Sequence, residues 1–466
     1  MNSFSELLQP DRGQPARSLN LVDAEGFDEW LKGLPPRARS AATAQRFAGK
    51  AGELAILSGD DPEDWSAAVG VEQSGTLGPW SLAKAAEALP EGSYRLDGTP
   101  GQALLGWLLA QHRFERYRKS EASSGPRVLV TSDPARMEDA IRLAGAVALV
   151  RDLVNTPTED MGPVQLEAQA QAVARAGGAT VRVTKGDELA GGYPLVHAVG
   201  RAAASDRAPR LIELEWGNPS HPRVAIVGKG VCFDTGGLDI KPSSGMRLMK
   251  KDMGGAAHAL ALAQLVMQNR LPIRVHLLIP AVENAIAGNA MRPGDVLRSR
   301  KGLSVEVSNT DAEGRLILAD ALTRAGEESP ELIIDFATLT GAARVALGPD
   351  LPATFVNDDA LADELLVAGK DEADPLWRLP LWPGYDEMLR SDIADLDNAP
   401  EGGMAGAITA ALFLQRFVDP GTPWAHLDTF AWRSAAKPGR PKGGEALGLR
   451  ACWELLRRRY LSVAAG

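Results

Sequence analysis

Residues 309–316 combine side chains that could hold a cation. They read Asn-Thr-Asp-Ala-Glu-Gly-Arg-Leu, so Asp311 and Glu313 stand two residues apart and Arg315 follows two residues later. An apolar helical pattern begins directly afterwards. Two carboxylates this close together repel each other at the mouth of an apolar segment, and a bound cation would relieve that repulsion. Taken alone, both acids could equally be solvated residues at the start of a helix, where the helix dipole favours negative charge.

A second cluster, residues 228–242, follows a buried apolar run. It reads GKGVCFDTGGLDIKP and contains Lys229, Asp234 and Lys241 between glycines that let the backbone approach another group closely. A phosphate-binding loop is one alternative, but the order GxxxxGK[ST] is absent. An aspartic protease is another, although the tripeptide Asp-Thr-Gly occurs here only once and would need a dimer to complete a site. Each lysine, taken singly, is better explained as a surface residue.

The third cluster, residues 249–257, reads MKKDMGGAA and places Asp252 at the start of a predicted helix. A carboxylate is favoured there as a helix cap, which is the simplest interpretation of Asp252 alone. The small residues that follow favour a role for Asp252 beyond capping, because they let the helix pack closely against a neighbouring backbone.

Alternating strand and helix patterns place these clusters on loops. The predicted strands are 224–227, 273–279, 303–307, 332–336 and 425–430, and the predicted helices are 253–269, 315–328, 405–417 and 445–460. This alternation is typical of an open α/β sheet with helices on both faces. Ligands bind such sheets beyond the carboxyl ends of the strands, so we expect the three clusters to meet there.

The first 125 residues are less regularly patterned than the rest. Strands are predicted at 55–57 and 128–130 and a helix at 102–117, and the polar stretch 120–125 is a candidate domain boundary. A long amphipathic helix is predicted at 136–154. We therefore expect an N-terminal α/β domain at 1–125, a linking strand and helix at 126–155, and a larger α/β domain at 156–466.

Composition narrows the function classes. The chain has 466 residues, 45% of them hydrophobic, and a formal net charge of −10, which argues against a general nucleic-acid binder. Two cysteines cannot form a disulfide framework, and the six histidines show no HExxH spacing. The first ten residues lack the features of a signal peptide, and no apolar run of about 18 residues predicts a membrane span. A cytoplasmic location without membrane attachment is expected.

Taken together, the three clusters resemble the leucyl (cytosol) aminopeptidase family, whose members carry them in this order and at similar spacing. Residues 309–316 match the family signature letter for letter, and the resemblance spans roughly 150–450, including 337–342, 391–410 and 441–444. It implies a small α/β N-terminal domain and a larger C-terminal α/β catalytic domain with a central mixed sheet flanked by helices. It also implies a homohexameric metallo-aminopeptidase that releases N-terminal amino acids, preferably Leu-like, from peptides by attack of a water molecule activated by two metal ions.

The resemblance also implies roles for individual residues. Asp234 and Glu313 would bridge two divalent ions, with Lys229 and Asp252 completing one metal site and Asp311 the other. Oxygen-rich ligands suit Mn²⁺ and are accepted by Zn²⁺. A lysine can act as a ligand only after losing its proton, which the field of two dications could force.

The family further implies two catalytic residues and a substrate pocket. Lys241 would stabilise the oxyanion, and Arg315 would hold a bicarbonate that shuttles the proton. Met249, Thr338 and Gly341 would surround the pocket for the substrate side chain, with Leu339 supplying a backbone contact. Two other functions stay open: a DNA-binding or regulatory role in addition to or instead of catalysis, and a metallophosphatase, for which no phosphate-holding residues are evident.

Overall fold

The computed structural model describes residues 4–61, 63–118, 125–400 and 402–461. The chain forms two compact units, Met1–Ala148 with Ser434–Lys442, and Leu149–Arg433 with Gly443–Gly466. The units meet along the chain inside helix α5 (Met137–Asn155), which matches the long helix expected at 136–154. Most of the predicted boundary at 120–125 lies outside the described residues, and the division at 125 and 155 remains a proposal.

The N-terminal unit contains a six-stranded sheet of order β1-β6-β5-β2-β4-β3, in which β3 alone is antiparallel to its neighbour. The strands are β1 (Leu8–Pro10), β2 (Arg17–Val22), β3 (Leu54–Ser58), β4 (Trp65–Gly70), β5 (Gly92–Leu96) and β6 (Arg127–Thr131). The helices are α1 (Phe27–Gly33), α2 (Pro36–Ala44), α3 (Ala83–Ala88) and α4 (Ala103–Leu109).

The helix expected at 102–117 is therefore too long. Helix α4 ends at Leu109, and the Arg113 guanidinium donates to the carbonyl oxygens of Ala110 and His112. These carbonyls are the acceptors that a continuing helix would need for its own backbone, so the side chain ends the helix early.

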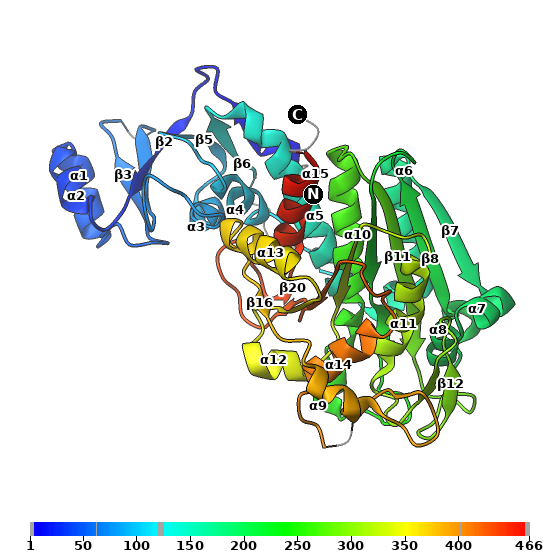
Figure 1. Cartoon of the computed structure of the whole chain (residues 1–466). Helices are drawn as coiled ribbons and strands as arrows, with labels where there is room; N and C mark the ends of the chain where they lie inside the picture. Colours follow the sequence, from blue (N-terminus) through cyan, green and yellow to red (C-terminus); the bar gives the residue numbers. More distant parts are fainter. Residues whose placement is uncertain (1–3, 62, 119–124, 401, 462–466) are drawn as a thin grey trace. The chain divides into compact units, whose positions relative to one another are not determined.

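The second unit is built on a nine-stranded mixed sheet of order β16-β15-β18-β14-β9-β11-β8-β7, with β10 added beside β11 (Figure 1). Its strands are β7 (Thr180–Lys185), β8 (Arg210–Trp216), β9 (Arg223–Gly228), β10 (Gly230–Asp234), β11 (Arg274–Asn284), β14 (Leu332–Ala337), β15 (Ala353–Val356), β16 (Trp377–Arg378) and β18 (Trp424–Asp428). Smaller sheets join β12 (Val296–Arg298), β13 (Ser304–Glu306) and β17 (Leu396–Asp397), and β19 (Trp432–Arg433) with β20 (Gly443–Gly444).

Helices cover both faces of this sheet, as the alternating pattern predicted. Besides α5, the helices of this unit are α6 (Pro163–Gly177), α7 (Gly186–Gly192), α8 (Pro194–Gly200), α9 (Ser243–Met246), α10 (Gly254–Gln268), α11 (Glu313–Gly326), α12 (Gly341–Leu347), α13 (Asp359–Asp371), α14 (Gly406–Gln415) and α15 (Leu449–Leu461). On β14, Ile333 and Ala337 share a core cluster with α11, whereas Phe336 points to the other face and stacks on His258 of α10. Successive side chains of a strand point to opposite faces, so a continuously apolar strand buries itself on both sides.

Four parallel strands bring chemically active residues to one edge of the sheet. Lys229 and Thr338 directly follow β9 and β14, while Asp234 and Asp428 are the last residues of β10 and β18. The pairings β10–β11, β11–β9, β9–β14 and β14–β18 are all parallel, so these ends lie side by side. The expectation that the chemistry lies beyond the carboxyl ends of the strands is confirmed. Across the described ranges, no helix combines the length and apolar character needed to cross a membrane.

Candidate active site

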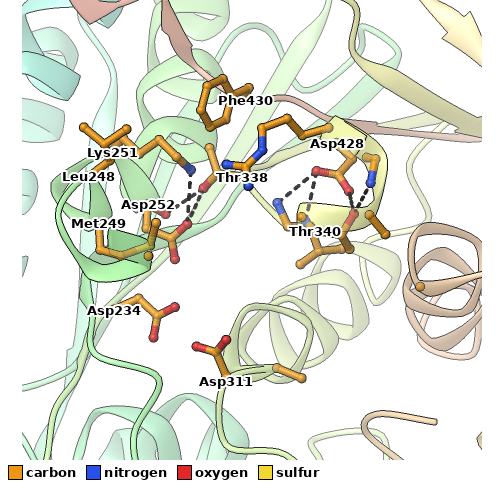
Figure 2. A pocket seen from close by; sticks show the side chains of 18 of the residues that line it. Asp234, Leu248, Met249, Lys251, Asp252, Asp311, Thr338, Thr340, Asp428 and Phe430 are labelled. Atoms are coloured by element: carbon orange, nitrogen blue, oxygen red, sulfur yellow. Dashed lines mark hydrogen bonds and ion pairs between the residues drawn. The ribbon is translucent and has the colours of Figure 1, made fainter. Parts of the chain in front are cut away.

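A cavity of about 470 Å³ opens at this edge of the sheet. Its lining contains ten of the eleven residues that the sequence singled out: Lys229, Asp234, Lys241, Met249, Asp252, Asp311, Arg315, Thr338, Leu339 and Gly341. The eleventh, Glu313, is 1% exposed and contacts the lining residue Lys229. Figure 2 shows Asp234 and Asp311 on one side of Asp252 and Thr338, with Lys251 and Phe430 on the other. We call the two sides the acidic end and the Phe430 end.

Carboxylates crowd the acidic end, which comprises Asp234, Asp252, Asp311 and Glu313 with two lysines. Oxygens of Asp234, Asp252 and Glu313 lie within 4.8 Å of one another, and all three side chains are buried. The oxygens Asp252 Oδ2 and Glu313 Oε1 are buried without accepting a hydrogen bond of good geometry. Buried, under-bonded carboxylate oxygens at this separation fit a divalent cation, which would neutralise their mutual repulsion.

The two lysines carry the opposing charge. Lys229 Nζ lies 2.7 Å from Asp252 Oδ2 and 3.0 Å from Glu313 Oε1, and it donates to the Thr338 carbonyl oxygen at 3.1 Å. Lys241 Nζ lies 2.8 Å from Asp234 Oδ2 and 2.5 Å from Asp311 Oδ1. Burial works against both ammonium charges, but the nearby carboxylates outweigh it, and the pKa of each lysine is raised.

Burial and like charge shift the acids unequally. The pKa of Glu313 is raised well above its usual value, first by burial and then by Asp234. The pKa of Asp311 is raised to about 6 by the same two causes. Burial also opposes ionisation of Asp252, but Lys229 beside it outweighs burial and the pKa falls. Repulsion between carboxylates is thus present in the folded chain, but its main source is Asp234, whereas the sequence predicted it between Asp311 and Glu313 themselves.

Two glycines make room for this arrangement. Gly236 has φ +86°, and a Cβ there would lie 2.4 Å from the Asp239 carbonyl oxygen and 2.9 Å from Asp311 Oδ1. A Cβ on Gly314 would lie 2.5 Å from Cε of Lys229. A side chain at Gly236 would displace Asp311, and one at Gly314 would displace Lys229. The backbone of the glycine-rich loop therefore closely approaches a residue of the site itself.

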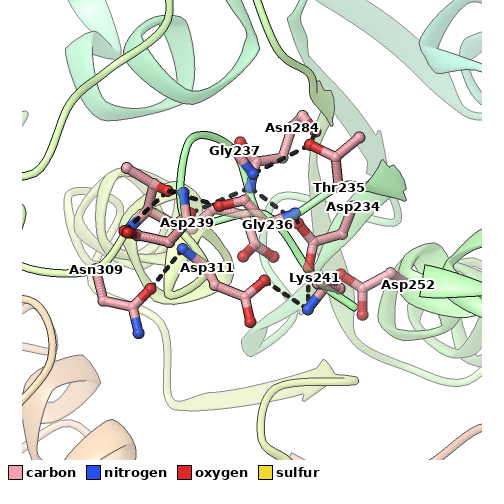
Figure 3. A network of polar contacts seen from close by, with 12 residues as sticks. Asp234, Thr235, Gly236, Gly237, Asp239, Lys241, Asp252, Asn284, Asn309 and Asp311 are labelled. Carbon is pink, nitrogen blue, oxygen red and sulfur yellow. Dashed lines mark hydrogen bonds and ion pairs between the residues drawn. The ribbon is translucent and has the colours of Figure 1, made fainter. Parts of the chain in front are cut away.

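A polar network joins the second cluster to residues 309–311 (Figure 3). Asn284 Nδ2 donates to Asp234 Oδ1 at 2.8 Å and to the Thr310 carbonyl oxygen at 3.1 Å. The backbone N–H of Thr310 donates to Asp239 Oδ2 at 2.7 Å, and the N–H of Asp239 donates to Thr310 Oγ1 at 2.8 Å. These reciprocal bonds hold the two loops against each other. Gly236 and Thr310, which are also hydrogen-bonded, lie 74 positions apart in the sequence.

The interpretation of Asp252 and Glu313 as helix-start residues with only a local role is wrong. Helix α10 begins at Gly254 and α11 at Glu313, and neither has a side-chain hydrogen bond at its cap. Asp252 instead accepts a hydrogen bond from Thr338 Oγ1 at 2.8 Å, across the cavity edge. Both carboxylates are committed to tertiary contacts, not to the ends of their own helices.

Arg315 is a buried guanidinium with unused donor capacity. Its Nη1 donates to the Asn398 carbonyl oxygen at 2.6 Å, whereas Nε is buried without an acceptor among the described residues. Burial lowers its pKa to about 10, so it stays charged at neutral pH. Arg315 also lines the cavity, where its planar fork could receive a planar anion.

Asp428 organises the strand-end loop that carries Thr338, Leu339 and Thr340. It accepts hydrogen bonds from the backbone N–H groups of Leu339 at 3.0 Å and Thr340 at 3.2 Å, and from Thr340 Oγ1 at 2.6 Å. The sequence did not single out Asp428, Lys251, Arg344 or Phe430, although all four line the cavity. For Asp428 a signal existed, because it lies near the end of the predicted strand 425–430, whose carboxyl end points at the site.

Comparison with known proteins agrees with this geometry. The model of the cytosol aminopeptidase family, catalytic domain, matches residues 148–453, and that of the M17 aminopeptidase N-terminal domain matches residues 18–129. A probable cytosol aminopeptidase of Syntrophotalea carbinolica is 43% identical over 368 residues, covering 75% of this chain and 73% of that protein.

Solved structures extend the likeness to the whole fold. The cytosol aminopeptidase of Coxiella burnetii superimposes with a TM-score of 0.92 and 43% identity, covering 97% of this chain and 99% of the other. The bottromycin maturation enzyme BotP, determined in complex with Mn, superimposes with a TM-score of 0.85 and 32% identity, covering 95% and 99%. With the buried carboxylates and lysines at the strand ends, these matches show that the chain belongs to the cytosol aminopeptidase family and is a metal-dependent aminopeptidase.

Proposed function

We propose that the chain removes Leu-like residues from the N-termini of peptides with two divalent ions, Mn²⁺ or Zn²⁺, held at the acidic end. The observation that carries the proposal is the buried group of Asp234, Asp252 and Glu313, whose carboxylate oxygens lie within 4.8 Å of one another. Asp234 and Glu313 would bridge the ions, Lys229 and Asp252 would complete one site, and Asp311 the other. Two bound ions supply Lewis acidity to the peptide carbonyl and lower the pKa of water.

Lys241 and Arg315 are the proposed catalytic residues. Lys241 Nζ is oriented by Asp234 and Asp311, and as a donor at the cavity wall it would stabilise negative charge developing on the carbonyl oxygen. Arg315 would hold bicarbonate through the guanidinium that lines the cavity, and the bound anion would supply a group able to accept and donate a proton. Its lowered pKa still leaves the guanidinium charged, which supports anion binding.

The substrate side chain would enter the part of the cavity lined by Met249, Thr338 and Gly341, and Leu339 would contact the substrate through its backbone. Leu248 and Met249 give this part an apolar wall, which suits a branched or thioether side chain. Asp428 would hold the loop in place through its three hydrogen bonds. A cytoplasmic location and a homohexameric assembly, both implied by the family resemblance, complete the proposal.

Hydrolysis of leucine p-nitroanilide by metal-stripped protein tests this function directly. The substrate is offered with Mn²⁺, with Zn²⁺ and without added metal, alongside N-acetyl-leucine p-nitroanilide as a control with a blocked amine. Activity that metal restores, and that the blocked substrate does not show, would support an aminopeptidase and identify the activating ion. Equal cleavage of both substrates would contradict the requirement for a free N-terminus.

A further inference from the structure

At the Phe430 end of the cavity an aromatic ring packs beside two cations. The Nζ of Lys251 lies 5.1 Å from the centre of the Phe430 ring, and Cζ of Arg344 lies 4.9 Å from it. All three residues line the same cavity as the acidic end. The ring face attracts cations, so Phe430 holds both side chains near the cavity wall.

Positive charge at this end is poorly compensated. Arg344, an exposed residue in the last turn of α12, forms no ion pair with any carboxylate of the described residues. The nearest carboxylate oxygen to Lys251 Nζ is Asp252 Oδ1 at 3.9 Å, and Asp252 is already engaged by Lys229 at 2.7 Å. Asp428 is the second acid that interacts electrostatically with Lys251, but its two oxygens already accept three hydrogen bonds from Leu339 and Thr340.

We propose that the Phe430 end selects the substrate's N-terminal residue by charge, accepting side chains that end in a carboxylate or carbonyl oxygen and rejecting Lys and Arg. This rests on the proposed function, in which that side chain enters the pocket beside Met249. The free guanidinium donors of Arg344 match a carboxylate, and can also bond an amide oxygen. Leu and Met, which carry no charge, would be held by the apolar wall of Leu248 and Met249 alone.

A cationic side chain has two reasons to bind poorly here. It would meet Lys251 and Arg344 as like charges, and juxtaposed like charges suppress a wrong partner strongly. It would also find the Phe430 ring already engaged by the chain's own cations, so the one group that could attract it is occupied.

A set of dipeptides X-Ala, with X as Leu, Met, Gln, Glu or Lys, tests this selection on the full-length protein with its activating metal. Met, Gln, Glu and Lys are unbranched and comparable in length, so their kcat/KM values report the chemistry of the side-chain tip. We expect Glu to exceed Lys by at least ~10-fold in kcat/KM, with Gln above Lys as well. Cleavage of Lys-Ala at or above the rate of Gln-Ala would overturn the proposal.

The variant Arg344→Gln removes the permanent charge and keeps a polar side chain on α12. We expect the Glu-to-Lys ratio to fall about tenfold, and Arg344→Glu to lower it further, while kcat/KM for Leu-Ala changes less than ~3-fold. Arg182→Gln, at an exposed residue of β7 with a side chain 67% accessible, is the matched control and should keep the wild-type ratio. An unchanged ratio in Arg344→Gln, with Leu-Ala still cleaved, overturns the charge selection alone. Failure of the wild type to cleave any X-Ala peptide overturns the proposed function instead.

Discussion

The two ends of the cavity handle charge in opposite ways. At the acidic end, Lys229 and Lys241 are each paired with two carboxylates at 3.0 Å or less. At the Phe430 end, Arg344 has no carboxylate partner among the described residues, and Lys251 is 3.9 Å from the nearest carboxylate. Both ends are fixed by the same strand edge, yet one balances its charges and the other leaves positive charge facing the cavity.

This difference separates two tasks. A buried, mutually compensating cluster loses far more when one member is removed, because an uncompensated charge is left in a low-dielectric interior. A partly exposed, unpaired cation can be replaced at little structural cost, and it changes only what binds next to it. We therefore expect substitutions at the acidic end to abolish turnover and substitutions at the Phe430 end to change substrate preference.

The largest effect is expected for Glu313→Gln. The amide keeps the shape of the side chain but cannot serve as an anionic ligand, and it leaves Lys229 with Asp252 alone. We expect metal content after dialysis to fall together with kcat/KM, by at least ~1,000-fold, which exceeds the loss of one oxyanion donor. Metal analysis and leucine p-nitroanilide hydrolysis measure both, with Glu188→Gln on the exposed face of α7 as control. Full activity with full metal content would refute the ligand assignment.

A smaller loss is expected for Arg315→Ala. The hydrogen bond of its guanidinium goes to the Asn398 carbonyl oxygen and not to a carboxylate of the acidic end. Its bond to the Asn398 carbonyl is lost and a planar anion can no longer be held. We expect kcat to fall by ~100-fold while the metal content stays at the wild-type level. Parallel loss of metal would show that Arg315 supports the metal sites and not the proton transfer.

An intermediate case, Asp428→Asn, tests whether the loop between the two ends positions the substrate. The amide cannot accept all three hydrogen bonds from Leu339 and Thr340, so the loop should shift by a fraction of an ångström. We expect kcat/KM to fall ~10- to 100-fold, mainly through KM, with metal content unchanged. Thr340→Val removes the hydroxyl that donates to Asp428 and that also accepts from the Ala343 N–H at 3.0 Å, and it should give a smaller change in the same direction. A drop in kcat with an unaltered KM would contradict a positioning role.

The smallest effect on activity is expected for Asp320, a buried carboxylate on α11 that lies outside the cavity lining. It accepts backbone N–H bonds from Leu195 and Arg300, at 2.8 Å each. Burial raises its pKa to about 7, although these hydrogen bonds favour the charged form. Asp320→Asn should leave kcat/KM within ~3-fold of wild type, because the residue does not line the cavity.

Asp320 should nevertheless affect the pH dependence of stability. Between its unfolded value near 3.8 and its folded value near 7, the folded state holds a proton that the unfolded state has released. The contribution of Asp320 to the free energy of unfolding therefore decreases by an amount on the order of a few kcal/mol as pH rises through this window. Above the window this contribution is constant. Thermal unfolding at pH 5 and pH 8 should show wild type losing more stability than Asp320→Asn across that interval. Parallel losses in both proteins would contradict the raised pKa.

Local sequence patterns located many of the strands and helices that lead into the site, whereas other elements, such as β7, β8, α6 and α13, were not predicted. The strands at 224–227 and 332–336 and the helices at 253–269 and 315–328 were placed within two residues of β9, β14, α10 and α11. Helix α4 was overextended because the contact that ends it, from Arg113 to two carbonyl oxygens, leaves no periodic signal. The role of Asp252 was ambiguous for a related reason. An aspartate just before a helix is expected both when it caps the helix and when it is a ligand in a tertiary site.

The sequence by itself determined the residue types of the acidic end, their order along the chain and the family to which they belong. It did so because the spacing of carboxylates, lysines and glycines is a local property of the chain. Strand ends and helix starts then orient these residues in a defined direction. Only the tertiary structure decided which lysine contacts which carboxylate, that Asp428 holds the loop of Leu339 and Thr340, and that the Phe430 ring packs beside Lys251 and Arg344. The contacts made by Asp428 and Phe430 join residues 86 to 179 positions apart, and parallel pairing of β9, β14 and β18 brings them together.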